Sequence, residues 1–313
     1  MTPSSSARPT DDEFDIARRG ISSFLGSAVT RIELVERQGS VNWTFRVTVG
    51  STRYAVRINR ASSIGDAFAK YSKERWFVDA ARTCDIPTPA VLDVGQSESG
   101  AWTIQEWIDG THATDERATY RTLGEYARRL AQHAPRPPHA LVPDANDNWR
   151  EQVRYNLDEL ATPDRLLGLQ VYCQRDLPAL REALAQLAQD RPSVGLDHGD
   201  LWPRNLMRRA DGSLVLLDWG CATIDVVPLA PLSRIFGERV LHPSPNADGL
   251  SAFAEGFGLT TIEAAAMETT VRAWALLKAF DLVRWAMDRC PARVADTSAR
   301  ARELMRALRP ALG

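Results

Sequence analysis

The sequence feature that most limits the fold is the stretch 198–205, which reads His-Gly-Asp-Leu-Trp-Pro-Arg-Asn. Two short apolar segments follow it, at 206–207 and 213–217, and the Asp-Gly pair at 211–212 between them is a strong signal for a tight turn. The sequence therefore predicts a β-hairpin. Because the two ends of a hairpin lie on the same side, this hairpin would bring Asn205 close to Asp218.

Asp200, Asn205 and Asp218 carry the oxygen atoms that phosphoryl transfer from ATP requires. The protein must orient the attacking hydroxyl group and hold magnesium on the phosphates, and magnesium takes few protein ligands. Each of these residues alone has an ordinary interpretation, as a turn cap or the end of a loop. All three at this spacing, around two strands, favour a catalytic site.

The pattern His-Gly-Asp-Leu-x-x-x-Asn followed by Asp-Trp-Gly resembles the aminoglycoside phosphotransferases, which are kinases of small-molecule alcohols. The resemblance implies that Asp200 is the catalytic base, that Asn205 and Asp218 bind Mg²⁺, and that ATP is the phosphoryl donor. It also implies an α+β, bilobal, protein-kinase-like fold with a small antiparallel-sheet N-lobe and a mainly helical C-lobe. We expect a flexible tail over 1–12, the N-lobe over 13–108, and the C-lobe with the acceptor site over 109–313.

Composition fits one two-lobed unit and excludes several other classes of protein. The 313 residues are 44% hydrophobic and carry a net charge of −2, which gives no electrostatic reason to expect nucleic acid or an anionic membrane as a partner. The N-terminus lacks the apolar core of a signal peptide, and no apolar run approaches the length of a membrane span. The four cysteines are widely separated, so we expect a cytoplasmic protein.

The first third of the chain predicts a helix over 15–25 and short strands over 32–35, 43–49 and 53–58. In a kinase-like fold, the turn between the first two strands covers the nucleotide phosphates, so Ser40 is a candidate phosphate-binding residue. Only Gly39 supports this interpretation, and an ordinary turn between strands explains the same residues equally well.

Arg57 lies on the third predicted strand, where the resemblance places a cation that binds the α- and β-phosphates. Relatives usually have lysine there, whereas arginine offers a planar fork with a permanent charge. Glu74 interrupts the apolar face of a predicted helix over 66–84, and the resemblance makes Arg57 its partner. The alternatives are a solvated arginine at the strand edge and a helix acid paired with Lys70.

A strand over 101–107 leads into the segment that would form the hinge of a kinase-like fold, where backbone groups bind the adenine edge. A plain strand followed by a turn is the alternative. The Pro-x-Pro at 87–89 locally resembles the hygromycin B phosphotransferase branch of the family. The candidate nucleotide-binding residues of the hinge are Gln105, Glu106, Trp107 and Ile108.

Beyond the hinge we expect only helices apart from the hairpin, including helices over 119–133, 149–160 and 177–188 and a basic one over 300–309. The segment 250–308 is periodic and rich in alanine. On its long helix we predict that Trp274 and Trp285 belong to the core. Asp281 and Asp288 could face an acceptor pocket, although solvated helix acids are the default interpretation.

Two positions depart from the family pattern. Trp202 stands where protein kinases have a lysine near the transferred phosphate, so Arg204 or Arg57 would have to stabilise the γ-phosphate charge. Pro231 stands where relatives carry an aspartate that anchors the catalytic loop. Asp225 could replace that acid from nearby, or backbone contacts alone could hold the loop.

The sequence thus predicts an ATP-dependent phosphotransferase that acts on a hydroxyl group of a small molecule, with an antibiotic as the first candidate. A metabolic kinase of the choline, homoserine, fructosamine or sugar type is the alternative within enzymes, and the Leu-Trp pair at 201–202 resembles the fructosamine kinases. A catalytically silent nucleotide-binding regulator is the alternative from another class. Mixed charges in the C-lobe favour an acceptor less cationic than an aminoglycoside, and both a monomer and a dimer remain open.

Overall fold

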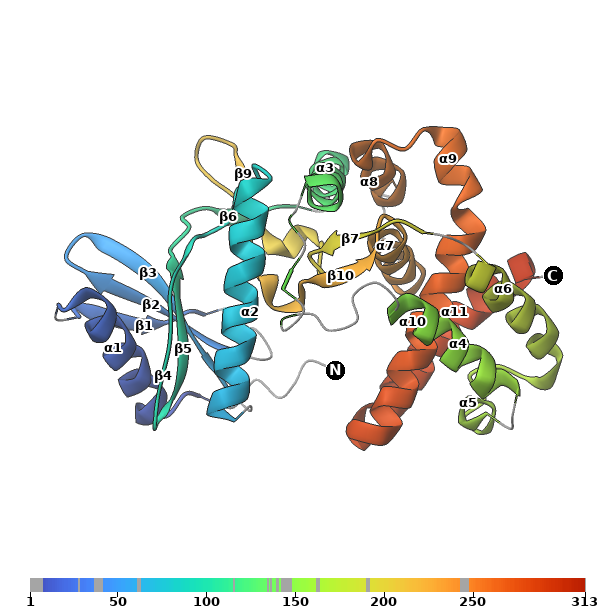
Figure 1. The fold of residues 1–313 in the computed structure, drawn as a ribbon, viewed down its shortest axis with the longest axis horizontal. Coiled ribbons are helices and arrows are strands. Elements are labelled where there is room, and N and C mark those ends of the chain that lie inside the picture. Colours follow the sequence, from blue (N-terminus) through green and yellow to red (C-terminus); the bar gives the residue numbers. More distant parts are fainter. Residues whose placement is uncertain are drawn as a thin grey trace. The chain divides into compact units, whose positions relative to one another are not determined.

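A computed structural model of the chain describes residues 8–27, 29–36, 42–60, 63–114, 116–133, 135, 137–138, 141, 148–161, 164–189, 192–242 and 248–312. The chain divides into two compact units (Figure 1), which are described separately. The sheet unit combines 1–113 with 204–222, and the helical unit combines 114–203 with 223–313. The tail predicted over 1–12 and the lobes predicted over 13–108 and 109–313 stay predictions; residues 1–7 lie outside the described part.

The sheet unit is built on a five-stranded antiparallel sheet with the order β1-β2-β3-β5-β4. Its long central strands, β2 and β3, pair over eight residues each, and Gly50, at φ 59°, supplies the left-handed residue that the turn between them needs. The strand bounds are Arg31–Leu34 for β1, Asn42–Val49 for β2, Thr52–Asn59 for β3, Val91–Ser97 for β4 and Gly100–Glu106 for β5.

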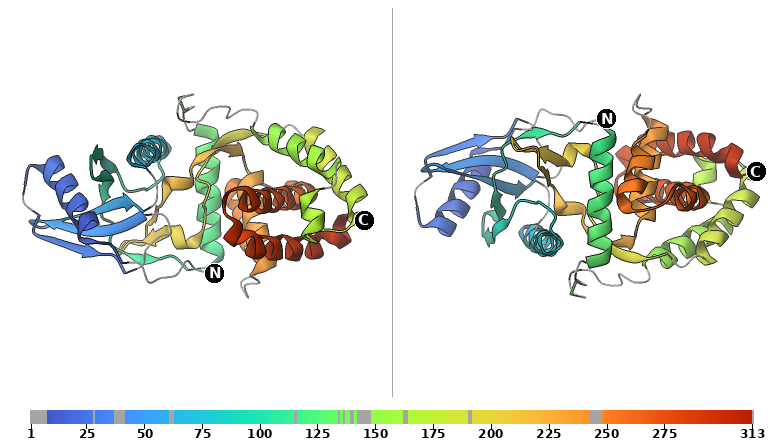
Figure 2. Two further views of the ribbon diagram at one scale, coloured as in Figure 1. Left: turned by 90° about the horizontal axis from the view of Figure 1, so that it is seen from below. Right: turned by 90° about the horizontal axis from the view of Figure 1, so that it is seen from above.

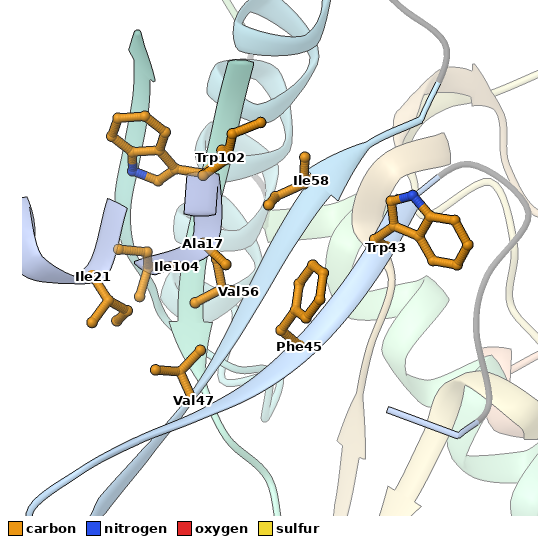
Figure 3. Close-up of a cluster of buried hydrophobic side chains, with 10 residues drawn as sticks. Ala17, Ile21, Trp43, Phe45, Val47, Val56, Ile58, Trp102 and Ile104 are labelled. Carbon is orange, nitrogen blue, oxygen red and sulfur yellow. The ribbon is translucent and has the colours of Figure 1, made fainter. Parts of the chain in front are cut away.

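One face of this sheet packs against helix α1, Asp11–Leu25, in the cluster of buried side chains that Figure 3 shows. Phe45, Val47 and Val56 are fully buried there. Gly95 of β4 lies opposite Trp102 of β5, and a Cβ atom at that glycine would meet the Trp102 ring at 2.4 Å, so this position requires glycine. The rest of the cluster consists of Ile16, Ala17, Ile21, Trp43, Ile58 and Ile104.

The opposite face of the sheet is covered by helix α2, Ile64–Thr83, which contacts β4 and β5 (Figures 1 and 2). Since side chains alternate along a strand, Val56 and Ile58 enter the α1 core while Arg57 between them points to the α2 side. The helix buries Tyr71, Phe77 and Glu74. The layer between α2 and the sheet therefore encloses a buried acid that faces Arg57.

The predicted hairpin is present and belongs to the sheet unit. Strands β8, Leu206–Arg208, and β9, Leu214–Leu216, pair antiparallel, and the short strand β6, Thr111–His112, extends them to a three-stranded sheet. At the turn, Gly212 has φ 84°, and Asp211 accepts hydrogen bonds from the backbone and hydroxyl of Ser213. A 3₁₀ turn over Trp219–Cys221 follows β9.

The helical unit packs its core around the long helix α10, Glu268–Arg289, which contacts α7 and α11 most extensively (Figure 2). Trp274, Leu277 and Phe280 of α10 are at most 1% exposed. The other helices are α3 Arg117–His133, α4 Asn148–Ala161, α5 Arg165–Gly168, α6 Leu177–Gln189, α7 Leu229–Leu241, α8 Gly249–Phe257, α9 Thr261–Ala266 and α11 Val294–Leu312. Short 3₁₀ turns cover Gln174–Asp176 and Pro291–Arg293, and another, Pro203–Asn205, lies where the chain passes from the helical unit to the sheet unit.

Two strands in the helical unit correct the prediction that this region is helical apart from the hairpin. Strand β7, Val194–Asp197, pairs antiparallel with β10, Thr223–Val226, so that Asp197 lies opposite Thr223 and Asp225 opposite Gly195. Both strands are only four residues long and are separated by the whole hairpin, which is why local periodicity did not reveal them.

The helix expected over 15–25 begins at Asp11, because Thr10 and Glu13 form a capping box at its start. Trp274 is buried as predicted, but Trp285 is 44% exposed, so its assignment to the core was wrong. Within the described residues, the structure contains no helix of the length and apolarity that crossing a membrane requires.

Candidate active site

The hairpin brings the two candidate metal ligands to one end, as its turn predicted. Leu206 pairs with Leu216, and one residue further out the backbone N–H of Leu217 donates to the carbonyl oxygen of Asn205 at 2.7 Å. Asn205 and Asp218 therefore flank the same last rung of the hairpin. The Asn205 side chain is buried, whereas the Asp218 carboxylate is 55% exposed and open to a ligand.

Asp218 has a backbone conformation that non-glycine residues rarely adopt, with φ 59° and ψ 68°. The following residue fixes this conformation, since Trp219 is 2% exposed and its Nε1 donates to Thr88 Oγ1 at 2.8 Å. A strained residue held by buried neighbours, with its own carboxylate exposed, is a common arrangement at binding and catalytic sites.

Arg57 lies at the centre of an ion network that includes this carboxylate. One guanidinium nitrogen donates to Glu74 Oε1 and the other to Asp218 Oδ1 at 3.2 Å. Gln105 Nε2 also donates to Glu74 Oε1, at 3.2 Å. The predicted ion pair of Arg57 and Glu74 is thus present, and the alternatives of a solvated arginine and a Glu74–Lys70 pair are not what the structure shows.

The electrostatics of this network favour a permanently charged Arg57. Burial alone would lower the pKa of its guanidinium, but the carboxylates of Glu74 and Asp218 outweigh that effect and raise the pKa above its ordinary value. Burial also raises the pKa of Tyr71, whose hydroxyl donates to Asn42 Oδ1 at 3.1 Å on the same side of the sheet. The site therefore presents a fixed cation beside an exposed acid.

The four residues of the expected hinge have different surroundings. The side chain of Gln105 is buried against Glu74. Glu106 uses its backbone N–H in a 3.1 Å bond to the carbonyl of Ala90, and its carboxylate accepts from the Ala90 N–H. This sheet pairing leaves Trp107 and Ile108 as the better candidates for backbone contacts with an adenine ring. Ser40, the candidate phosphate ligand, lies outside the described residues.

In the helical unit, the candidate base Asp200 follows strand β7 in a loop ordered by His198. The imidazole ring is fully buried, and its Nδ1 accepts the backbone N–H of Asp200 at 3.2 Å. Gly199 has φ 79°, a left-handed conformation that favours glycine. These contacts support the prediction that His198 orders the loop, and Asp200 itself is partly exposed.

Sequence reasoning missed a charged cluster behind this loop. Arg234 of α7 forms ion pairs with Asp197 Oδ2 at 2.6 Å and with Asp225 Oδ2 at 3.3 Å. Lys278 of α10 lies 3.8 Å from Asp225 and donates to Gln152 Oε1 at 2.6 Å. The sequence carried no local signal for this cluster, because the strand that ends at Asp197 was not recognised and Arg234 lies far from it in the chain.

Two described residues of the sheet unit offer oxygen atoms that could bind a hard metal ion. No group of three or more His, Cys, Asp or Glu residues in the described part could hold a metal ion by itself. Asn205 and Asp218 supply two hard oxygen ligands, which suits magnesium because phosphate oxygens and water complete its shell. Arg204 is exposed in the 3₁₀ turn immediately before Asn205, and its assigned role stays a prediction.

Comparisons with known proteins identify the family and the fold of the chain. A protein-family model described as the phosphotransferase enzyme family matches residues 35–227, more than half of the chain. Among solved structures, a thermostable mutant of the aminoglycoside phosphotransferase APH(4)-Ia in a ternary complex with AMP-PNP and hygromycin B has a TM-score of 0.63. It is 20% identical, and the alignment covers 92% of this chain and 97% of that one.

Two other solved structures show the same likeness. The gentamicin complex of APH(2")-IIa has a TM-score of 0.64 at 13% identity, covering 95% of this chain and 99% of that one. Spectinomycin phosphotransferase, APH(9)-Ia, with ADP and spectinomycin has a TM-score of 0.56 at 13% identity, covering 92% and 93%. No curated protein sequence matches the chain. At these identities the structures show the fold, and the predicted α+β, protein-kinase-like class is confirmed.

Proposed function

The chain belongs to the phosphotransferase enzyme family, and we propose that it transfers the γ-phosphoryl group of ATP to a hydroxyl group of a small-molecule antibiotic. The observation that carries the proposal is the end of the hairpin, where Asn205 and the exposed Asp218 meet and Arg57 contacts Asp218. The complexes of structural relatives with AMP-PNP and with ADP support nucleotide binding. A cytoplasmic location, where ATP and magnesium are available, is part of the proposal.

Arg57 is proposed to bind the α- and β-phosphates of the nucleotide. Glu74 orients the guanidinium from one side, and the buried amide of Gln105 fixes the carboxylate of Glu74 in turn. The planar Arg57 fork can donate two parallel hydrogen bonds to phosphate oxygens in a fixed geometry, whereas a lysine ammonium acts as a point charge. Backbone groups of Trp107 and Ile108 are the proposed contacts of the adenine ring, and Ser40 remains a candidate contact of the phosphates.

Asn205 and Asp218 are the residues that would hold Mg²⁺. When bound, the ion neutralises charge on the phosphates and orients them. The chain contributes a buried amide whose position the hairpin fixes and a carboxylate that the packing of Trp219 holds outward.

Asp200 is the proposed general base. It would accept the proton of the acceptor hydroxyl while the oxygen forms a bond to the γ-phosphorus and the bond from that phosphorus to the β,γ-bridging oxygen breaks, which releases ADP. Arg204 would stabilise the negative charge on the transferred group. Trp202, in the place where protein kinases have lysine, carries no charge for this task.

The acceptor is proposed to be an antibiotic less cationic than most aminoglycosides. The two helix acids that could have faced a cationic acceptor are both engaged within the helical unit. Asp281 accepts from Asn156 Nδ2 at 2.7 Å, and Asp288 accepts from Arg165 at 2.7 Å. A polycation would have to compete with these contacts. The structural relatives were solved with hygromycin B, gentamicin and spectinomycin, which defines the first compounds to test.

The proposal can be tested by incubating the protein with ATP, magnesium and a panel of compounds, then detecting the addition of one phosphoryl group by mass spectrometry. The panel contains polycationic aminoglycosides, less cationic antibiotics, choline, homoserine, fructosamines and sugars. We expect phosphorylation of a weakly cationic antibiotic. A product only with one of the metabolites would instead establish the metabolic alternative.

Two variants make this test specific. Asp200→Asn removes the proposed base and should lower turnover by roughly 10²- to 10⁴-fold. Asp211→Asn removes an exposed acid from the turn of the hairpin and should leave turnover unchanged. Binding of ATP without phosphorylation of any compound, and without hydrolysis, would support the silent regulator and overturn the proposal.

A further inference from the structure

The strands that flank the catalytic loop carry two acids on one face. Asp197 ends β7 directly before His198, and Asp225 lies on β10. In the antiparallel register, Asp197 pairs with Thr223 and Gly195 with Asp225, so the two carboxylates are diagonal neighbours on the same face. The Asp197 side chain is 1% exposed and that of Asp225 is 13% exposed. Two acids so close and so buried require a cation.

Arg234 supplies that cation from helix α7. Its guanidinium lies 2.6 Å from Asp197 and 3.3 Å from Asp225, so one side chain links both strands to the helix. Among the described residues, neither oxygen of Asp197 accepts a well-aligned hydrogen bond, which makes the charge of Asp197 depend on Arg234. Lys278 cannot replace this contact, because its 3.8 Å approach is to Asp225.

The charge of Arg234 also acts on the loop itself. Burial lowers the pKa of the guanidinium, but the carboxylates of Asp197, Asp225 and Asp200 together raise it above its ordinary value. Arg234 is therefore within electrostatic range of Asp200. On the backbone side, only His198 and Gly199 separate Asp197 from Asp200, and the buried His198 ring binds the Asp200 N–H.

We propose that Arg234 is a positioning residue for phosphoryl transfer: it ties β7 and β10 to α7 and thereby fixes the loop that presents Asp200. This inference rests on the proposed role of Asp200. It also accounts for a departure from the family pattern, since Pro231 occupies the place of the usual anchoring acid. Here the acids lie on the strands and the residue on α7 is the cation, which reverses the charges of such an anchor.

The test compares Arg234→Met, which keeps the length of the side chain and removes the charge, with Arg234→Lys, which keeps the charge. Arg300→Met is the matched control, because Arg300 binds Glu238 of the same helix α7 at 2.6 Å and lies outside the loop cluster. Three quantities are measured on each full-length variant: hydrogen exchange of amides 198–202, affinity for ATP, and turnover with its pH profile.

In Arg234→Met we expect exchange in 198–202 to be at least about tenfold faster, while exchange in β2 and β3 stays unchanged. Turnover should fall at least about tenfold with ATP affinity within about twofold of wild type, because the proposed nucleotide ligands belong to the sheet unit. Loss of the cation should also move the acid limb of the turnover profile to higher pH. Arg234→Lys should recover part of each change, and Arg300→Met should show none.

Two results would overturn the inference. One is Arg234→Met with wild-type exchange in 198–202, and the other is exchange that accelerates equally across the helical unit, which would make Arg234 a general stabilising residue. Failure of the proposed function is distinguishable, because a wild-type protein without transferase activity still reports on the loop through hydrogen exchange. If the Met variant does not fold, Asp197→Asn tests the same contact from the strand.

Discussion

Arg57 in the sheet unit and Arg284 in the helical unit are both nearly buried arginines held by acids, but their networks end differently. The Arg57 side chain is 12% exposed and is bonded to the buried Glu74 and to Asp218, which is 55% exposed. The Arg284 side chain is 2% exposed, and its main partner Asp164 is fully buried at 2.8 Å. One network therefore opens to solvent through a carboxylate, and the other is closed.

In the closed network, Arg284 and Asp164 bond to other buried groups of the helical unit. Arg284 also donates to the side chain of Asn156, while Asp164 accepts the hydroxyl of Tyr172 at 2.6 Å and the N–H of Leu166 at 3.0 Å. Arg284 also lies 3.7 Å from Glu159 and 4.0 Å from Asp281, so its charge is compensated entirely by acids of the helical unit. The network can therefore stabilise the packing of α4, α5 and α10. In the Arg57 network, the exposed Asp218 carboxylate can still bind a ligand. This difference distinguishes a candidate binding site from a structural ion pair made of the same residue types.

The largest effect on stability should come from Arg284→Met. The change leaves the fully buried Asp164 without its cation, and breaking a buried pair in this way costs about 3–5 kcal/mol of the free energy of unfolding. Urea denaturation measures the loss. Arg121→Met, which removes an exposed pair with Glu255, is the control and should change stability little. If the two variants lose equal stability, the closed network is not what distinguishes Arg284.

Asp218→Asn should have the opposite profile. Its carboxylate is exposed and contributes little to folding, but as a proposed metal ligand its loss should lower turnover by about a hundredfold or more. Turnover is measured against magnesium concentration with the acceptor found in the panel, and Asp211→Asn of the same hairpin serves as control. Unchanged turnover at low magnesium would exclude Asp218 from the metal site.

The sequence predicted the Arg57 network and not the buried networks, for a physical reason. The hairpin from 206 to 217 is a local structure with its own turn signal, so the proximity of Asn205 and Asp218 followed from short-range geometry. Glu74 interrupts an apolar helix face, and this pattern predicts a buried acid with a cationic partner. The structure shows the expected pair with Arg57.

By contrast, Arg234 and Arg284 meet acids that lie 37 and 120 positions away in the chain, at Asp197 and Asp164. No local pattern encodes such pairings, because they depend on how helices pack. The error at Trp285 has the same origin. Helix α10 is buried on most of its surface, so its hydrophobic periodicity could not show which aromatic residue faces solvent.

Replacing Arg57 should have an effect of intermediate size, on the affinity for ATP. Arg57→Met removes charge-assisted hydrogen bonds to the phosphates and should weaken ATP binding by about ten- to hundredfold, measured by calorimetric titration. Arg57→Lys should retain more affinity, because the charge remains while the fork is lost. Arg31→Met is the control, since Arg31 lies on the same sheet and its exposed side chain pairs with Glu33 at 2.6 Å. If Arg57→Met binds ATP with wild-type affinity, the Arg57 network is not part of the nucleotide site.

The smallest effect is expected at a third pair, Arg309 of α11 with Asp176, which is half closed: the acid is buried and the arginine is exposed. Burial would raise the pKa of Asp176, but hydrogen bonds from Arg309 and Cys173 outweigh it and lower the pKa to about 2. The folded state thus binds this proton less well than the unfolded state, whose carboxyl pKa is about 3.9. The stabilisation by this pair is present above about pH 5 and is lost as the pH falls toward 2. At neutral pH the free energy of unfolding should be higher for wild type than for Asp176→Asn. That difference should shrink on acidification. A difference independent of pH would mean that packing, and not charge, holds α11 at this point.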